Sequence, residues 1–227
     1  MLDSRATTVR LCLTMGPPLD AQALLRAGVL EGTSIVCAGS RGGPFGEEVA
    51  RACAALGARV TTWAQGEEAA DTHVLCYDGA AAFAAKAGER EALDACLADA
   101  WESTRALVAA RLLELYGEEN AGGRAQDGRG GSAPGDPAGH PSRIIYIAPR
   151  ARSGAFADAA RAGLENLART LSIEWARYGI RTVAIAPGAE VSAAEVAALV
   201  AYLCSPAGGY FSGSLLDLTG PAVSLPN

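Results

Sequence analysis

Short apolar segments alternate with longer amphipathic ones along most of this 227-residue chain, and this alternation limits the folds that it can adopt. Segments such as Thr33–Gly39 (TSIVCAG) and Arg143–Ala148 (RIIYIA) are almost wholly apolar, which is typical of strands buried on both faces. Buried strands that alternate with helices form βαβ units, whose crossovers are right-handed. The pattern therefore predicts an α/β fold: a doubly wound, mostly parallel sheet with helices on both faces.

The spacing of the apolar residues gives the expected elements. Strands are expected at residues 33–39, 58–63, 73–76, 143–148, 180–186 and 215–218, and helices at residues 47–56, 93–116, 155–178 and 193–203. The helical faces are formed by Val49, Cys53 and Leu56 in the first helix, by Trp101, Thr104, Val108, Leu112 and Leu115 in the second, and by Leu164, Leu167, Leu171 and Trp175 in the third. Gly57 and Gly179 follow two of these helices and are expected to stop them.

The length fits one α/β domain that spans residues 1–227. Half of the residues are hydrophobic and 19% are charged, which excludes a disordered chain. Residues 1–30 are expected to form an N-terminal extension, either an added strand around TTVRLCLTM or a loosely packed segment. Residues 117–142 are rich in Gly and Pro and contain no Val, Ile, Leu, Met or aromatic residue, so they are expected to form a flexible surface loop.

Charge and cysteine content narrow the possible partners. The net charge of −6 argues against nucleic acid or an anionic membrane as the main partner. No run approaches the length of a membrane helix, and no export signal is visible, so a cytoplasmic location is expected. The six cysteines never form a C-x-x-C pair and are expected to be buried thiols. No metal site is expected, because only His73 and His140 could assist and neither adjoins a cysteine pair.

Several motifs in the last third of the chain occur in a familiar order. These are AGLENLARTL (162–171), EWARYGIR (174–181), Pro187-Gly188 and SGSLLDLTG (212–220). In this order they closely resemble the C-terminal half of the short-chain dehydrogenase/reductase (SDR) family. The earlier segment VCAGSRGGPFGEEVARACAALGARV (36–60) resembles the first βαβ unit of that family. The resemblance covers most of the chain and implies a Rossmann-like fold.

The resemblance also identifies the positions where the family keeps its catalytic groups. In the family, a tyrosine four residues before a lysine is the general acid/base at the substrate oxygen. The lysine lowers the pKa of the tyrosine and holds the ribose, and a serine on the preceding strand binds the substrate oxygen. Alignment through the AGL motif puts Arg161 at the lysine position, Ala157 at the tyrosine position and Pro149 at the serine position. Phe156 lacks a hydroxyl too, and Ala100 lies near the position of the family's helix asparagine. The resemblance therefore implies that no catalytic residues are retained.

The cofactor turn departs from the family pattern as well. Gly39, Ser40, Arg41, Gly42 and Gly46 would hold NAD(P), if the chain binds any cofactor, at the start of the helix that follows the first strand. Ala38 replaces the first motif glycine, and Pro44 and Phe45 would crowd the phosphates. We therefore expect no cofactor, with NAD(P) as the alternative.

Two segments are shorter than in the family. Residues 64–72 are too few for the further helix, strand and helix that the family inserts there, so an edge strand is expected to be missing. After Pro187-Gly188 the chain passes straight into the next helix, so the substrate lid is expected to be missing. Asp78 and Asp217 follow or end strands, and they are expected to be turn or cap residues.

These features favour a non-catalytic subunit, rather than an enzyme, in a homo- or hetero-oligomer with an active SDR paralogue. The resemblance implies that assembly uses the helices at 93–116 and 155–178, with the last helix and strand as a second interface. One alternative is an NAD(P)-dependent oxidoreductase with a rearranged site that uses Arg161, Tyr77 or Lys86. A second alternative is a small-ligand binding module that uses the vacated cleft.

Overall fold

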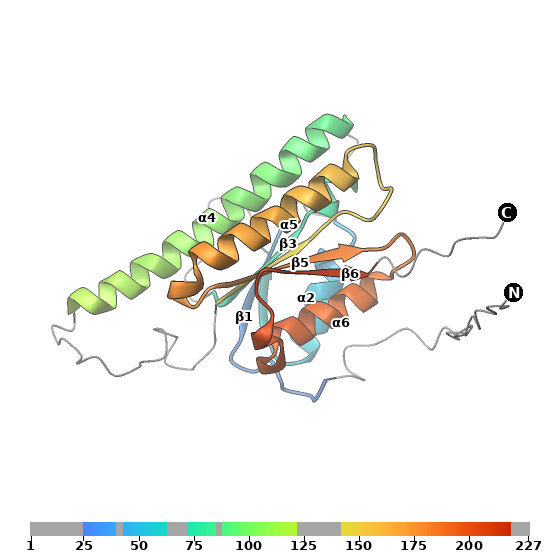
Figure 1. The fold of residues 1–227 in the computed structure, drawn as a ribbon. Coiled ribbons are helices and arrows are strands. Elements are labelled where there is room, and N and C mark those ends of the chain that lie inside the picture. Colours follow the sequence, from blue (N-terminus) through green and yellow to red (C-terminus); the bar gives the residue numbers. More distant parts are fainter. Residues whose placement is uncertain (1–24, 40–42, 63–71, 85–87, 122–141, 219–227) are drawn as a thin grey trace, which may run out of the picture.

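The computed structural model contains a parallel sheet covered by helices on both faces (Figure 1). It describes residues 25–39, 43–62, 72–84, 88–121 and 142–218, with only the backbone for residues 110–121. The strand order in these residues is β2-β1-β3-β4-β5-β6, and every pairing is parallel. The expected Rossmann-like, doubly wound fold is thereby confirmed.

The elements lie close to their expected places in the sequence. The strands are β1 (Ser34–Ala38), β2 (Arg59–Thr62), β3 (Val74–Asp78), β4 (Arg143–Ile147), β5 (Arg181–Pro187) and β6 (Ser214–Leu218). The α-helices are α2 (Gly46–Ala55), α3 (Ala80–Ala84), α4 (Glu89–Ala121), α5 (Ala157–Glu174) and α6 (Ala193–Cys204), and the 3₁₀ helices are η1 (Ala176–Tyr178) and η2 (Pro206–Tyr210). The short helices α3 and η2 were not expected from the sequence.

Two hydrophobic layers hold the helices on the sheet. On one face, α2 and α6 bury Val49, Cys53 and Val196 against β1, β3 and β5. On the other face, α4 and α5 bury Cys96 and Leu164 against β3 and β4. The strands β1, β3 and β4 are buried along their whole length, as their continuous apolar sequences predict.

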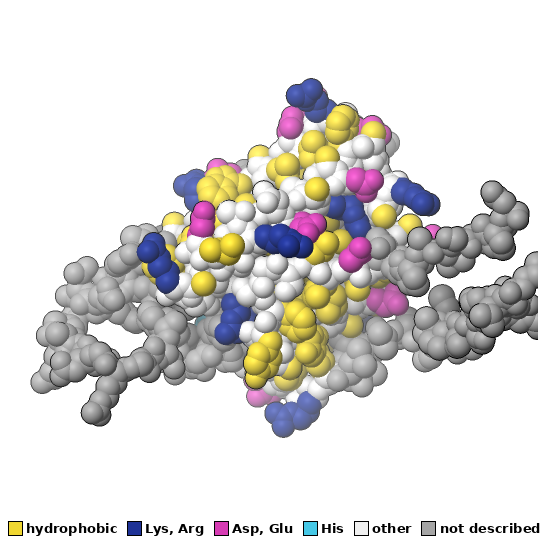
Figure 2. Space-filling model, viewed as in Figure 1, with side chains coloured by type: hydrophobic (Ala, Val, Ile, Leu, Met, Phe, Trp, Pro, Cys, Tyr) yellow, Lys and Arg dark blue, Asp and Glu magenta, His cyan; other side chains and the backbone are white. Residues whose placement is uncertain are grey.

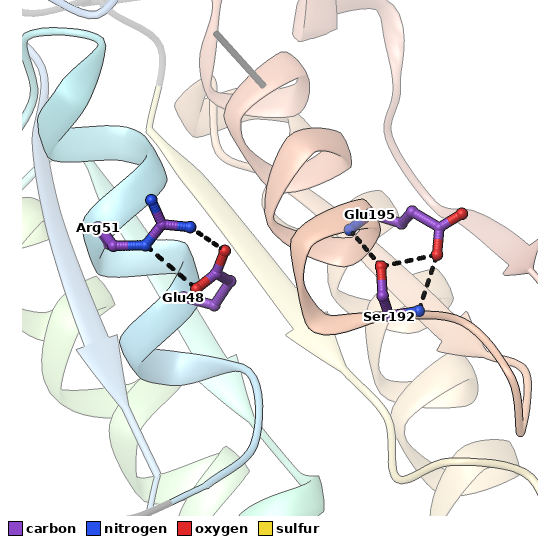
Figure 3. Close-up of polar contacts among 4 residues, drawn as sticks. All are labelled: Glu48, Arg51, Ser192 and Glu195. Carbon is purple, nitrogen blue, oxygen red and sulfur yellow. Dashed lines mark hydrogen bonds and ion pairs between the residues drawn. The ribbon is translucent and has the colours of Figure 1, made fainter. Parts of the chain in front are cut away.

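Helices α2 and α6 begin in different ways (Figure 3). The Oγ of Ser192 accepts from the backbone N–H of Glu195, and the Glu195 carboxylate accepts from the N–H of Ser192, which forms a capping box at α6. In α2, Glu48 pairs with Arg51 one turn later, but the residue before the helix, Phe45, has no side chain that could cap it. The cap of α2 must therefore come from elsewhere in the fold.

The long helices differ from the expected bounds. The expected loop at 117–142 begins too early, because α4 continues to Ala121. The Glu and Ala residues in GEENA favour helix, and the glycine at position 117 lowers the stability of the helix by only about 1 kcal/mol. The helix expected at 155–178 is shorter, since α5 ends at Glu174 and η1 follows. Gly179 then ends this stretch with a φ of 71°.

The expected side-chain faces are partly correct. Thr104 and Val108 are buried beneath α4, but Trp101 is 43% exposed, because Ala100 rather than Trp101 lies on the buried face of the helix. Leu164 and Leu171 of α5 are fully buried, and Leu167 and Trp175 also pack against this core. The side chains of Leu112 and Leu115 lie outside the described residues.

The expected loss of an edge strand falls on residues 64–72, of which only Thr72 is described. Among the described residues, β2 pairs with β1 alone. β5 ends at Pro187 and α6 begins at Ala193, which leaves no room for a lid. Of the expected N-terminal extension, only residues 25–30 are described, and Leu30 is buried in the core. No helix of the described residues is long and apolar enough to span a bilayer.

Substitution of Gly79 by alanine is expected to lower the free energy of unfolding by about 1–3 kcal/mol, measured by urea denaturation. The added Cβ would lie 2.9 Å from the carbonyl oxygen of Ile147 and 3.0 Å from Leu164. Gly154→Ala is the control, because its nearest neighbour, Phe83, would be 3.5 Å away. Equal stability of the two variants would show that the contact between β3, β4 and α5 is looser than described.

Candidate functional site

The order of the strands reverses between β1 and β3: the chain places β2 on one side of β1 and all later strands on the other side. In parallel α/β sheets, ligands bind beside such a point at the carboxyl ends of the strands. β1 leads there into Gly39, and β3 ends at Asp78. β4 and β5 lead into Pro149 and Pro187 at the same edge. The candidate site is therefore built from the residues that follow these four strands.

The side chain of Asp78 supplies the missing cap of α2. Its Oδ2 accepts hydrogen bonds from the backbone N–H groups of Phe45 and Gly46, each at 3.0 Å. Its Oδ1 accepts a third bond, also of 3.0 Å, from the N–H of Ala80 at the start of α3. One buried carboxylate therefore binds the first N–H groups of two helices, and the expectation that Asp78 is a cap residue is confirmed.

Two opposing effects act on the Asp78 carboxyl. Burial raises its pKa above the usual value, because the charged form loses its contact with water. The backbone N–H bonds from Phe45, Gly46, Ala80 and Ala81 lower the pKa, but by less. The surrounding backbone N–H groups therefore place the Asp78 carboxylate as a hydrogen-bond acceptor, although burial of its negative charge costs free energy.

The glycines of the turn after β1 pack closely around Asp78. Gly39 has a φ of +121°, and a Cβ there would lie 2.7 Å from the carbonyl oxygen of Asp78. A Cβ on Gly43 would lie 2.4 Å from Oδ2 of Asp78. Gly46 is the first residue of α2 and donates its N–H to the same oxygen. Of the predicted cofactor residues, Gly39 and Gly46 therefore lie around Asp78, while Ser40, Arg41 and Gly42 are outside the described residues.

Arg161 lies at the opposite side of the site, on α5. Its Nη1 donates to the carbonyl oxygens of Pro149 at 2.9 Å and Pro187 at 2.7 Å. Its Nη2 is 3.9 Å from the carboxylate of Asp217 on β6. With only 14% of its side chain exposed, Arg161 ties together the ends of β4, β5 and β6.

Arg150 extends across the same edge. Its guanidinium lies over the ring of Phe45, 4.9 Å from the centroid, in a cation–π contact. Its Nη1 donates to the carbonyl oxygens of Gly188, at 3.3 Å, and Val191. Since Phe45 is fully buried, Arg150 covers the turn before α2 and joins it to the segment after β5.

The remaining candidates are placed as follows. Ala157 is buried at the first turn of α5 and carries no polar side chain. The hydroxyl of Tyr77 donates to the carbonyl oxygen of Cys96 at 2.7 Å, and burial raises its pKa far above the usual value. Tyr77 therefore lies in the core between the sheet and α4, where it cannot reach a substrate at the strand ends. Lys86 is outside the described residues.

The thiols follow the expectation from the sequence. Cys37, Cys53, Cys76, Cys96 and Cys204 are all free and buried, and Cys12 is outside the described residues. Within the part of the chain that is described, no three His, Cys, Asp or Glu side chains are arranged to hold a metal ion. His73 is engaged by the backbone, since its Nδ1 accepts from the N–H of Ser34 at 3.1 Å.

The sequence did not reveal the two arginine contacts. Arg150 follows the apolar strand as an ordinary polar residue, and no local pattern distinguishes it. The signal for Asp78 was stronger, because it ends a buried strand and precedes a glycine. Its two hydrogen-bond partners at α2, Phe45 and Gly46, lie more than 30 residues away, so only the strand order brings them to Asp78.

Substitution of Asp78 by alanine is expected to lower the free energy of unfolding by about 2–3 kcal/mol, because three backbone N–H groups at two helix starts lose their acceptor. Urea denaturation followed by circular dichroism measures the change.

Asp158→Ala is the matched control, since Asp158 also lies in the first turn of a helix but is exposed. Its loss is expected to cost about 0.5 kcal/mol. If Asp78→Ala is no more destabilising than this control, the cap contributes no more than an exposed carboxylate does.

Comparison with known proteins gives a likeness in structure alone. No family model matches the sequence. No curated protein matches it either.

Among solved structures, a citronellol catabolism dehydrogenase of Pseudomonas aeruginosa is 20% identical with a TM-score of 0.57, covering 86% of this chain and 96% of its own. A short chain dehydrogenase of Mycobacterium avium is 22% identical, with a TM-score of 0.57; the match covers 85% of this chain and 84% of that protein. A 3-ketoacyl-(acyl-carrier-protein) reductase of Brucella melitensis, solved with NADH, is 20% identical, with a TM-score of 0.53; the match covers 84% of this chain and 98% of that protein. Over most of its length, this chain has the fold of these dehydrogenases and reductases.

Proposed function

We propose that this chain is a member of the SDR family that has lost catalysis and serves as a subunit of an oligomer with an active paralogue, or of a homo-oligomer. One observation carries the proposal: the Asp78 carboxylate accepts the N–H groups at the start of α2. In this fold, those N–H groups are the ones that receive the pyrophosphate of a dinucleotide. A carboxylate from the chain itself takes that place here.

Displacement of this carboxylate by a dinucleotide would be unfavourable on two counts. Asp78 would lose three backbone hydrogen bonds, and its charge would remain beside the incoming phosphates. Gly43 packs against Oδ2 of Asp78, so the turn is already filled at this point. We therefore propose that the chain binds no NAD(P), although the Brucella reductase of the same fold was solved with NADH.

The positions that correspond to the family's catalytic residues support the same proposal. Pro149 and Ala157 have no group that could hold or move a proton. Arg161 keeps a positive charge, but its Nη1 is bound to the carbonyl oxygens of Pro149 and Pro187. An arginine so engaged cannot take the lysine's two tasks of lowering a tyrosine pKa and holding a ribose.

The proposed assembly surface is the outer face of α4 and α5. Trp101 on α4 is 43% exposed and Ile173 on α5 is 79% exposed, while Ala159 and Ala162 offer a small-residue surface on α5. Exposed large apolar groups on two adjacent helices favour a partner of matching character, which here is the corresponding helix pair of a second SDR-type subunit.

A second candidate surface lies at the other end of the chain. Figure 2 shows hydrophobic side chains gathered on the lower part of the visible face, where α6 and η2 lie in Figure 1. Tyr210 of η2 is 94% exposed there, and the ring of Phe211 packs edge-on against Tyr202 of α6. This surface corresponds to the family's interface at the last helix and strand, and we propose it as the secondary contact.

Titration of the purified chain with NADH and NADPH is expected to give no saturable binding up to millimolar cofactor, because the anion position at α2 is occupied by Asp78. Tryptophan quenching, energy transfer to the nicotinamide and isothermal calorimetry would measure it. Free tryptophan amide at equal absorbance corrects for inner-filter quenching. If NADH or NADPH binds with micromolar affinity and a substitution in the turn between β1 and α2 abolishes this binding, the alternative of a rearranged oxidoreductase would be favoured instead.

Native mass spectrometry of the chain, alone and after co-expression with an active SDR protein of its own genome, is expected to give a stable oligomer. Ala162→Glu should reduce the assembled fraction at least tenfold, because it adds a charge to the proposed α4–α5 interface. Ala54→Glu is the control, since Ala54 is exposed on α2 at the other face of the sheet. A monomer under both conditions would contradict the proposed subunit role.

A further inference from the structure

Two arginines lie side by side at the edge of the sheet opposite to the candidate site. Arg143 is the first residue of β4, Arg181 is the first residue of β5, and the two are directly paired in the parallel register. A Cβ on Gly209 of η2 would lie 2.9 Å from Nη1 of Arg181 and 3.4 Å from Nη2 of Arg143. Both guanidinium groups therefore meet at the backbone of η2.

Arg143 is buried and incompletely satisfied. Only 5% of the residue is exposed, and its Nη1 donates to the carbonyl oxygens of Leu203 and Ser205, the latter at 2.7 Å. Its Nε is buried without a hydrogen-bond partner. Buried donors of this kind are rare in folded proteins, and a bound water or ion is one way in which they are satisfied.

The charge of the pair is also unbalanced. In the described residues, the ion pairs of arginine with carboxylates involve Arg51, Arg105, Arg161 and Arg169, and none involves Arg143 or Arg181. The carbonyl oxygens that bind Arg143 carry no charge. Burial and, to a smaller extent, the positive charge of Arg181 lower the pKa of Arg143. Two adjacent cations without a carboxylate are costly to fold, unless an anion offsets them.

We propose that Arg143 and Arg181 form a binding site for an oxyanion, either a phosphate or a carboxylate group. Guanidinium groups donate pairs of parallel N–H bonds that match the oxygens of such groups. Nη2 of Arg143 and the guanidinium of Arg181 make no hydrogen bond to any described residue, so they are available to such a ligand. The site lies at the amino ends of β4 and β5, so it is independent of the cofactor position at α2.

The full-length chain is titrated with sodium phosphate and, separately, with sodium acetate, and sodium chloride keeps the ionic strength constant. Calorimetry and thermal unfolding are expected to give saturable binding and a rise in Tm with at least one of these anions. Binding of phosphate alone would identify a phosphate site, and binding of both with similar affinity would identify a carboxylate-tolerant site. No saturable binding of either anion would overturn the proposal.

Arg181→Gln is the main test variant, because Arg181 makes no side-chain hydrogen bond to a described residue and its loss should leave the fold intact. It is expected to weaken anion binding at least tenfold. Arg105→Gln is the control, since Arg105 is exposed and pairs with Glu102 on α4. Arg143→Lys is a second variant that keeps the charge but not the fork of donors, and it should also weaken binding. Wild-type affinity in the folded Arg181→Gln protein would overturn the proposal.

Discussion

The carboxylate of Asp78 determines how the first half of the sheet is assembled. It ends β3, yet its partners are N–H groups before α2 and at the start of α3, so one side chain fixes two helices on neighbouring strands. The glycines at positions 39 and 43 are required because Asp78 approaches their backbone closely. A turn that in many α/β proteins surrounds a ligand is here closed around a side chain of the protein itself.

The other groups at this edge follow the same principle. Arg161 and Arg150 donate hydrogen bonds to backbone carbonyl oxygens at the strand ends and in the segment after β5. Each contact satisfies polar groups that a sheet leaves unpaired where its strands end. These polar residues at the carboxyl edge thus stabilise the fold directly.

The sequence predicted most of the fold, because buried parallel strands and amphipathic helices leave strong local patterns. The α2 face of Val49, Cys53 and Leu56 is buried as predicted, and every described strand was expected within about two residues at each end. The errors arise where local patterns are weak. Glycine at position 117 suggested a helix end, and the spacing placed Trp101 on the same helical face as Thr104 and Val108, although its side chain is exposed. The contacts of Arg150 and Arg161 depend on strand order and could not be derived from local sequence.

The pairing of β3 with β4 has a consequence for how the chain reaches this structure. Val74 pairs with Arg143, so the centre of the sheet joins segments about 70 residues apart, while β1–β3 and β4–β6 each connect over shorter stretches of chain. Closure of a longer loop costs little additional free energy at equilibrium, but contacts between distant residues slow folding strongly. The two halves of the sheet are therefore expected to form first and to join late. Lengthening of the chain between α4 and β4 would delay folding far more than it would weaken the folded protein.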